Sequence, residues 1–485
     1  MQIQNIYMLE NFDLKQINEI NLVFKNQKIE FSAQKLSQQI SKCSNLKFLT
    51  IDLRSNQIDS QIALELGQGI SKCEGLNSIN INLSGNSIEQ KGALGLIYGI
   101  SRCKSLESLV LDLYGNQIEQ QGAASLGEYI KKLENLNSLT LDLRGNLIGD
   151  QGLEKLGNDL AECLKISSLI LYLQTSKISN IGAHSLAFGI SNYQNIQILN
   201  INLQNNQIND QGLISIAESL SNLYSLVNLS LMIQGNQYTQ DGIKWLSAGI
   251  TRCKNLESLS LDFIILTAQD MFSLQSIDKF DECEKQDDQF LLSSLKRLNK
   301  LDITIKDDQF QITNESVQLL GQELSKLINL SQLILEIQFS ALIEQGAQEL
   351  FITLQGLINL TSLSIKIYEN DLIDINFTNL PILLSSCNKI KYLKLDLSFQ
   401  DSKFLYCVED GLLHLNSLVS IYLILSTSQK EVITSLMQCL NHKKDLQNIV
   451  LMNSLRTVMI DRIQKQKQIQ KLLKLKKLVY SKLSF

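Results

Sequence analysis

The sequence predicts an α/β solenoid, a curved horseshoe with a parallel β-sheet on its concave face and helices on its convex face. The first observation is a phrase of alternating and then helically spaced apolar residues that returns every 30 residues. The second is its constant frame, which starts at Leu46, Leu76, Leu106, Leu136, Ile166, Ile196, Leu226 and Leu256. A fixed period of this length gives units that pack only on their neighbours, which is typical of a solenoid.

The first part of each phrase predicts a strand. In the repeat that starts at Leu136, apolar and polar residues alternate over residues 139–143. A period of two indicates a strand with one buried face. Gly145 and Asn146 then supply turn chemistry, and Ile148 returns to the core. Because every strand follows the same course, the sheet is expected to be parallel.

The second part of each phrase predicts a helix. Leu153, Leu156 and Leu160 recur at helical spacing, while Glu154 and Lys155 place charge on the other face. A helix with its side chains is about 10 Å wide, whereas parallel strands lie about 4.8 Å apart. One helix per strand therefore splays the outer rim and bends the array.

An asparagine recurs in the turn after the strand. A turn stacked on identical turns leaves backbone groups without water, and an amide side chain has two donors and an acceptor with which to pair them. We therefore expect an asparagine ladder, weakened where Ser176 replaces the amide. The ladder residues are Asn56, Asn86, Asn116, Asn146, Asn206, Asn236 and Asn370.

The cysteines follow the repeat. Equivalent positions in other repeats hold Leu133, Tyr193 or Leu223, so the position is interpreted as buried packing rather than as a metal or disulfide site. Six of the nine cysteines lie three residues before a strand phrase, namely Cys43, Cys73, Cys103, Cys163, Cys253 and Cys387.

These residues resemble the leucine-rich repeat, L-x-x-L-x-L-x-x-N-x-I-x-x-x-G-x-x-x-L. The similarity is greatest to the ribonuclease-inhibitor-like subtype, which has a full helix in every repeat. Its glycine matches Gly92, Gly122, Gly152, Gly182, Gly212 and Gly242. The resemblance implies a fold that presents a long surface to a protein partner.

We expect a single solenoid over residues 1–485. Residues 1–45 are interpreted as a capping unit, with a degenerate first strand at 17–22, and residues 46–274 as the regular repeats. Residues 275–290 form an acidic insertion without the oxygen spacing of a calcium loop. Looser repeats follow over 291–453, and residues 454–485 are interpreted as a basic C-terminal cap.

The charge distribution is uneven. The whole chain carries a net charge of −5, but residues 454–485 carry +8, so residues 1–453 carry −13. An acidic body with a basic end does not fit a nucleic-acid-binding array. The basic end is either a solvated cap or a contact for an acidic partner or an anionic membrane surface.

No catalytic or cofactor-binding pattern is visible. His184, His414 and His442 lie in separate repeats without metal or triad spacing, and no phosphate-binding loop is present. We expect no enzyme activity, no metal and no cofactor. The start of the chain lacks a secretory signal, no apolar run reaches membrane-spanning length, and the cysteine usage fits a reducing, cytoplasmic setting.

The polar positions between the strand leucines are the candidate binding surface. One interpretation is that exposed strand positions need only be polar and that repeat duplication copied them. The other is that their acidic and aromatic groups bind a basic segment of a partner. Asp112 and Asp142 should be neighbours that repel one another. The candidates on this concave face are Asp52, Asp112, Tyr114, Asp142, Arg144 and Tyr172.

Trp245 is a further candidate on the convex side. Equivalent helix positions hold residues such as Ser185 and Ser215, none of them large and apolar. The side chain either anchors a second contact or packs into a local gap beside Tyr238.

The favoured function is a non-enzymatic scaffold that binds a protein partner. The resemblance also implies two alternatives. One is a GTPase-activating regulator using Arg54 or Arg144, although the acidic C-terminal tail of such proteins is replaced here by a basic end. The other is an inhibitor that wraps its target enzyme.

Overall fold

A computed structural model gives the structure of the chain. It describes residues 2–3, 14–23, 33–263, 292–306, 314–339, 344–369, 378–397, 402–425, 436, 438–440, 442–443 and 445–453. The expected acidic insertion at 275–290, the basic cap at 454–485 and Asn370 lie outside the described residues. The chain divides into two compact units, unit 1 (Met1–Leu256) and unit 2 (Glu257–Phe485). The subdivision of a single solenoid at residues 45, 274, 290 and 453 stays a prediction.

Unit 1 contains parallel strands that follow one another in chain order. From β3 onward each residue pairs with the residue 30 positions later, as Phe48 pairs with Ser78. The strands are β1 (Gln2–Ile3), β2 (Glu19–Val23), β3 (Phe48–Asp52), β4 (Ser78–Asn82), β5 (Ser108–Asp112), β6 (Ser138–Asp142), β7 (Ser168–Tyr172), β8 (Ile198–Asn202) and β9 (Asn228–Met232). The strand expected at residues 17–22 is present as β2, but it is not the first strand, because β1 precedes it and pairs with it.

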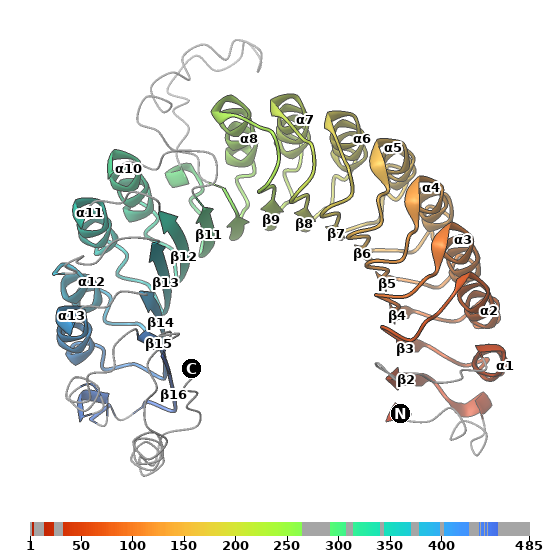
Figure 1. Ribbon diagram of the computed structural model, residues 1–485, viewed down its shortest axis with the longest axis horizontal. Helices are drawn as coiled ribbons and strands as arrows, with labels where there is room; N and C mark the ends of the chain where they lie inside the picture. The colour runs from red at the N-terminus through yellow and green to blue at the C-terminus, as the bar shows by residue number, and fades with distance from the viewer. Residues whose placement is uncertain are drawn as a thin grey trace. The chain divides into compact units, whose positions relative to one another are not determined.

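One helix follows each strand from β2 to β9. Within unit 1, the strands line the inner side of a curve and the helices lie on its outer side (Figure 1). A short 3-10 helix, η2 (Leu14–Gln16), precedes β2. The helices are α1 (Ala33–Ser41), α2 (Ser60–Ile70), α3 (Glu89–Ile100), α4 (Glu119–Ile130), α5 (Gly149–Leu160), α6 (Asn180–Ser191), α7 (Asp210–Ser221) and α8 (Gln240–Arg252).

Unit 2 repeats the same alternation of parallel strands and helices. Its strands are β10 (Ser258–Leu261), β11 (Lys300–Lys306), β12 (Gln332–Phe339), β13 (Ser362–Glu369), β14 (Tyr392–Leu397), β15 (Ser420–Leu425) and β16 (Asn448–Asn453). Its helices are η4 (Leu292–Ser294), α10 (Asn314–Ser325), α11 (Glu344–Leu354), α12 (Leu380–Ser386) and α13 (Ser402–Leu413). The predicted fold class, a parallel sheet alternating with helices, is confirmed.

The core lies between the sheet and the helices. Leu139, Leu141 and Leu143 of one strand phrase are fully buried, as are Ile148 in the turn and Leu156 in the helix. Burying an aliphatic side chain of this size contributes about 1.5–3 kcal/mol. Since every repeat supplies the same set of residues, the core is continuous along each unit.

The asparagine ladder is present in unit 1. Asn86 Oδ1 accepts hydrogen bonds from the backbone N–H groups of Asn56 and Ile58, both at 2.9 Å. Its Nδ2 donates to the carbonyls of Leu53, at 3.1 Å, and Leu83, at 2.7 Å. One buried amide therefore pairs four backbone groups from two neighbouring turns, and Asn116, Asn146, Asn206 and Asn236 occupy equivalent buried positions.

Ser176 interrupts the ladder as the sequence predicts. The side chain is fully buried, and its Oγ donates to the carbonyl of Gln174 in its own turn, at 3.2 Å. The backbone N–H of Ser176 still donates to Asn206 Oδ1, at 3.0 Å. The following repeat thus supports this turn, but the shorter side chain does not bridge to the preceding one.

The cysteine position is a hydrogen-bonding position as well as a packing position. Cys73 Sγ lies 3.2 Å from the carbonyl oxygen of Ile40, near the end of the preceding helix. Tyr193 occupies the equivalent place, and its hydroxyl donates to the carbonyl of Leu160 at 2.7 Å. A thiol and a phenol therefore contact the same buried carbonyl position at the end of the preceding helix, and the six predicted cysteines are buried free thiols.

Close helix packing requires a glycine at position 99. A Cβ atom there would overlap the carbonyl oxygen of Gly67 on the neighbouring helix α2. The clash involves backbone, so no side-chain rotation relieves it. Gly189 of α6 meets the backbone of Gly157 of α5 in the same way.

We predict that Asn116→Ala lowers the free energy of unfolding by about 3 kcal/mol, because it leaves buried backbone groups unpaired. Asn116 Oδ1 accepts from Ile88 N, and its Nδ2 donates to the carbonyls of Leu83 and Leu113. Denaturant unfolding measures the change. Asn158→Ala, at an exposed amide of α5, is the control and should change stability by less than about 0.5 kcal/mol. Equal effects of the two substitutions would contradict the ladder.

A second prediction concerns the buried thiols. Burial raises the pKa values of Cys73, Cys103 and Cys253 to about 12, and the thiolate is the reactive species. Alkylation of the folded protein at mildly alkaline pH should therefore modify these residues far more slowly than half-buried Cys407. Peptide mass spectrometry measures the rates, and labelling of Cys73 as fast as Cys407 would show that its site is open.

Candidate functional site

The solvent-facing side of the unit 1 strands, with the residue two positions beyond each strand end, is called here the sheet face. Six of the seven predicted binding residues lie on it. Parallel pairing places Asp112 of β5 opposite Asp142 of β6, and Asp142 opposite Tyr172 of β7. Tyr114 and Arg144 follow two positions after β5 and β6.

Two aspartates of the sheet face are paired with an arginine of their own repeat. Arg54 Nε donates to Asp52 Oδ1 at 2.9 Å, and its Nη2 donates to Oδ2 at 2.7 Å. Arg144 Nε lies 2.9 Å from both carboxylate oxygens of Asp142. These pairs are bidentate, the strong form of a carboxylate–guanidinium contact.

The structure corrects one expectation about these aspartates. The alternating pattern predicts exposed side chains, but Asp52 and Asp142 are only 9% and 5% exposed. Each carboxylate is covered because the arginine two residues later folds back over it. The two acidic groups are therefore largely neutralised within the protein.

Arg144 is held between two aromatic rings. Its guanidinium carbon lies 5.1 Å from the ring centroid of Tyr114 and 5.5 Å from that of Tyr172. Both distances are within the range of cation–π attraction. The hydrogen bond to Asp142 raises the pKa of the Arg144 guanidinium further. Two rings and a carboxylate thus fix this cation, while Tyr114 stays 48% exposed.

Asp112 differs from the other two aspartates of the sheet face. Its Oδ1 accepts from the backbone N–H of Tyr114 at 3.1 Å, and its Oδ2 accepts from Asn82 Nδ2 at 2.7 Å. Among the described residues, no lysine or arginine forms an ion pair with it. Partial burial raises the pKa of the Asp112 carboxyl, and the neighbouring Asp142 raises it further, against the opposing effect of Arg144.

The sequence did not single out three further residues of this face. Asn82 holds the Asp112 carboxylate, and the apolar side chains of Phe48 and Ile198 are 51% and 37% exposed at the starts of β3 and β8. A signal for the latter two existed, because other repeats place serine there, as at Ser108 and Ser138. Exposed apolar residues at the strand starts extend the surface available to a partner.

Trp245 is not part of the sheet face. It lies on α8, on the helix side of unit 1, and its side chain is half-buried. One interpretation of the sequence has Trp245 pack beside Tyr238. The side chain of Tyr238 is only 8% exposed. The structure therefore separates Trp245 from the other six candidates.

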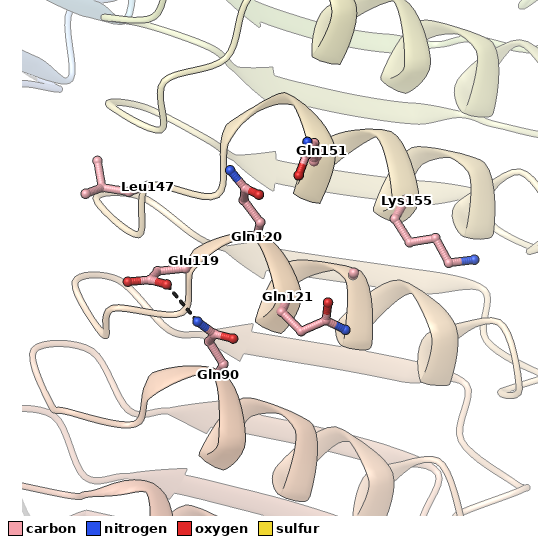
Figure 2. Close-up of a pocket in the computed structure, with 8 residues that line it drawn as sticks. Gln90, Glu119, Gln120, Gln121, Leu147, Gln151 and Lys155 are labelled. Carbon is pink, nitrogen blue, oxygen red and sulfur yellow. Dashed lines mark hydrogen bonds between the residues drawn. The ribbon is translucent and has the colours of Figure 1, made fainter.

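A polar surface groove lies at the starts of the helices in unit 1. It encloses about 650 Å³ beside α3, α4 and α5. Figure 2 shows Gln90 and Glu119 directed at one another, with Gln90 Nε2 donating to Glu119 Oε2 at 2.7 Å. Lys155 at the other side pairs with buried Asp159 at 3.1 Å. Glu119 is thus hydrogen-bonded and Lys155 is ion-paired, and none of the predicted binding residues lines the groove.

No site for metal-dependent chemistry is found in the part of the chain that the structure describes. Histidine, cysteine, aspartate and glutamate do not gather there in groups of three or more able to hold a metal ion. Nδ1 of His184 lies 3.1 Å from the hydroxyl of Ser215, which is a contact between neighbouring helices.

Comparison with known proteins agrees with the fold. Residues 135–157 and 195–217 match the family model described as Leucine Rich repeat. The first match covers β6 and most of α5, and the second covers β8 and most of α7. Together with the parallel sheet and its alternating helices, these matches identify leucine-rich repeats in unit 1. No curated protein matched the chain. None of the helices in the described ranges is long and apolar enough to cross a membrane.

The titration of Asp112 tests the electrostatics of this site. We predict a carboxyl titration midpoint above the ordinary value of 3.8, measured by NMR of the side-chain carboxyl carbon. Because the folded state then holds the proton more tightly than the unfolded chain, ionised Asp112 costs stability at neutral pH. That cost disappears as the pH falls below the pKa of the Asp112 carboxyl in the unfolded chain.

Arg144→Gln should raise this midpoint further, because it removes a cation and leaves Asp142 unpaired. Lys155→Gln, on the helix side, is the control and should leave it unchanged. A midpoint at or below 3.8 in the native chain would show that the carboxylate is already compensated.

Proposed function

We propose that this protein is a non-enzymatic interaction scaffold that binds a protein partner through the sheet face of unit 1. The partner contributes a basic segment. The observation that carries the proposal is the Asp112 carboxylate, which has no ion pair among the described residues and lies next to the exposed Tyr114 ring. A lysine or arginine placed there neutralises the carboxylate and stacks on the ring.

The rigidity of the surrounding groups supports this assignment. Tyr114 and Tyr172 enclose Arg144, and Arg144 is held by Asp142. A surface that is already ordered loses little side-chain entropy when a partner binds. Aromatic and arginine side chains are also enriched at the centres of protein interfaces. Arg144 is therefore a positioning residue that keeps the two rings in place.

The GTPase-activating alternative has less support. An arginine that inserts into a partner's nucleotide site needs a guanidinium that can leave its own surface. Arg54 and Arg144 are each held in a bidentate pair with an aspartate. Releasing either one leaves a largely buried carboxylate without its counter-charge, which is costly.

The inhibitor alternative would use the same face. It rests on the resemblance to the ribonuclease-inhibitor-like subtype, which we retain as a proposal because each regular repeat carries a full helix. Trp245 remains a proposed second contact on the helix side. Inhibition assays on the enzymes recovered with the protein separate an inhibitor from a scaffold.

We also propose a reducing intracellular setting. The support is that eight cysteines in the described ranges are free thiols and seven of these are buried. Their burial gives them a packing role that does not depend on oxidation. The expected contact of the basic end with an acidic partner or an anionic surface concerns residues 454–485, outside the described residues.

Substitution of Asp112 tests the proposal. The full chain and its Asp112→Asn variant are used to purify partners from cells that express the protein, and the affinity of the recovered partner is measured at several salt concentrations. Loss of one charge pair at an interface should weaken binding about tenfold. The salt dependence should fall as well, because one electrostatic contact is gone.

Glu154→Gln is the matched control, since it removes an exposed carboxylate from the helix side of a neighbouring repeat. It should leave the affinity unchanged. Identical affinity and salt dependence for Asp112→Asn and the native chain would refute binding at this carboxylate. GTP hydrolysis accelerated by the protein would favour the regulator instead.

A further inference from the structure

A second cluster of exposed aromatic and cationic groups lies on the strands of unit 2. Tyr392 and Lys394 are two residues apart on β14, so their side chains leave the same side of the sheet. Tyr422 of β15 is the direct register partner of Lys394. Tyr392, Lys394 and Tyr422 are called here the lysine–tyrosine patch.

The neighbouring residues leave the patch open. Tyr392 pairs in register with Ser362 on one side and Ser420 on the other, and Lys394 pairs with Ser364 on β13. Serine side chains are short, so they do not cover the taller groups between them. Tyr392 is accordingly 52% exposed.

Lys394 is exposed, and the Tyr422 ring lies against it. Its Nζ lies 5.2 Å from the ring centroid of Tyr422. This contact favours one position of the flexible side chain through cation–π attraction. The ammonium is therefore biased toward one place on the sheet before any partner arrives.

The charge of Lys394 is unmatched within the described residues. A neighbouring lysine shows the contrast, because Lys366 of β13 pairs with Glu336 of β12 at 3.1 Å. Lys394 instead contacts the ring of Tyr422. It has no ion pair with a carboxylate in the part of the chain that the structure describes. The patch thus offers a free positive charge between two aromatic side chains.

We propose that the lysine–tyrosine patch binds an acidic segment of a protein partner. A glutamate or aspartate carboxylate of that segment pairs with Lys394 Nζ, and an adjacent side chain of the segment packs on the exposed Tyr392 ring. This surface goes beyond the function proposed above, because it lies on unit 2 and selects a segment of the opposite charge. Its failure and the failure of the Asp112 site are independent.

Fluorescence anisotropy with the full chain tests the proposal. The probe is a fluorescein-labelled glutamate-rich peptide containing leucine, and an uncharged glutamine-rich peptide of the same length is the comparison. The native protein should bind the glutamate-rich peptide more tightly, and Lys394→Glu should weaken that binding at least about tenfold. Lys394→Gln should give a smaller loss, and Tyr392→Ala should weaken binding with little change in salt dependence.

Lys391→Glu is the matched control, because Lys391 is an exposed lysine just before β14. It should change the affinity by less than about twofold. Absence of glutamate-rich peptide binding, or equal losses for Lys391→Glu and Lys394→Glu, would overturn the proposal. A single-stranded oligothymidylate that binds with the same dependence on Lys394 would overturn it too, since the patch would then accept any polyanion. Circular dichroism and thermal unfolding verify that each variant is folded.

Discussion

The repeats depend on a single requirement, which is that the buried backbone of each turn must find hydrogen bonds in the next turn. Asn86 meets it by pairing groups of its own turn and of the turn before it. An unpaired buried amide or carbonyl costs about 1–3 kcal/mol, so the ladder fixes both the spacing of the turns and the register of the strands. That register then decides which side chains meet on the sheet face.

Charge on the sheet face is a consequence of this register. A constant 30-residue step places Asp112 beside Asp142, where two like charges destabilise one another. Arg144 neutralises the charge of Asp142. The two rings that contact Arg144 belong to Tyr114 and Tyr172, in the repeats on either side. Asp112 keeps its charge at some cost to the folded state. A group that destabilises the free protein and lies beside an exposed ring is well placed to be satisfied by a partner.

The fold could be predicted from the sequence because its signals are repetitive. The leucine spacing predicted the strands. The burial of the cysteine position could be predicted because one repeat holds Cys73 there and another holds Tyr193. Pair contacts on the sheet face were harder to foresee. Whether Arg144 folds back over Asp142 or extends to solvent depends on its rotamers and on ring positions in two neighbouring strands. The Lys394–Tyr422 contact was missed because the repeat spacing gives the register of β14 and β15 but not the conformations of the two side chains.

Site-specific photocrosslinking distinguishes the sheet face from the helix side of unit 1 as the surface that binds a partner. A benzophenone amino acid is placed at Thr140, which lies on the sheet face between Val110 and Ile170, and in a second variant at Asn158 on the helix side. If the sheet face binds the partner, the partner is crosslinked from position 140 and not from position 158. Crosslinking from position 158 alone would place the interface on the helices and contradict the account.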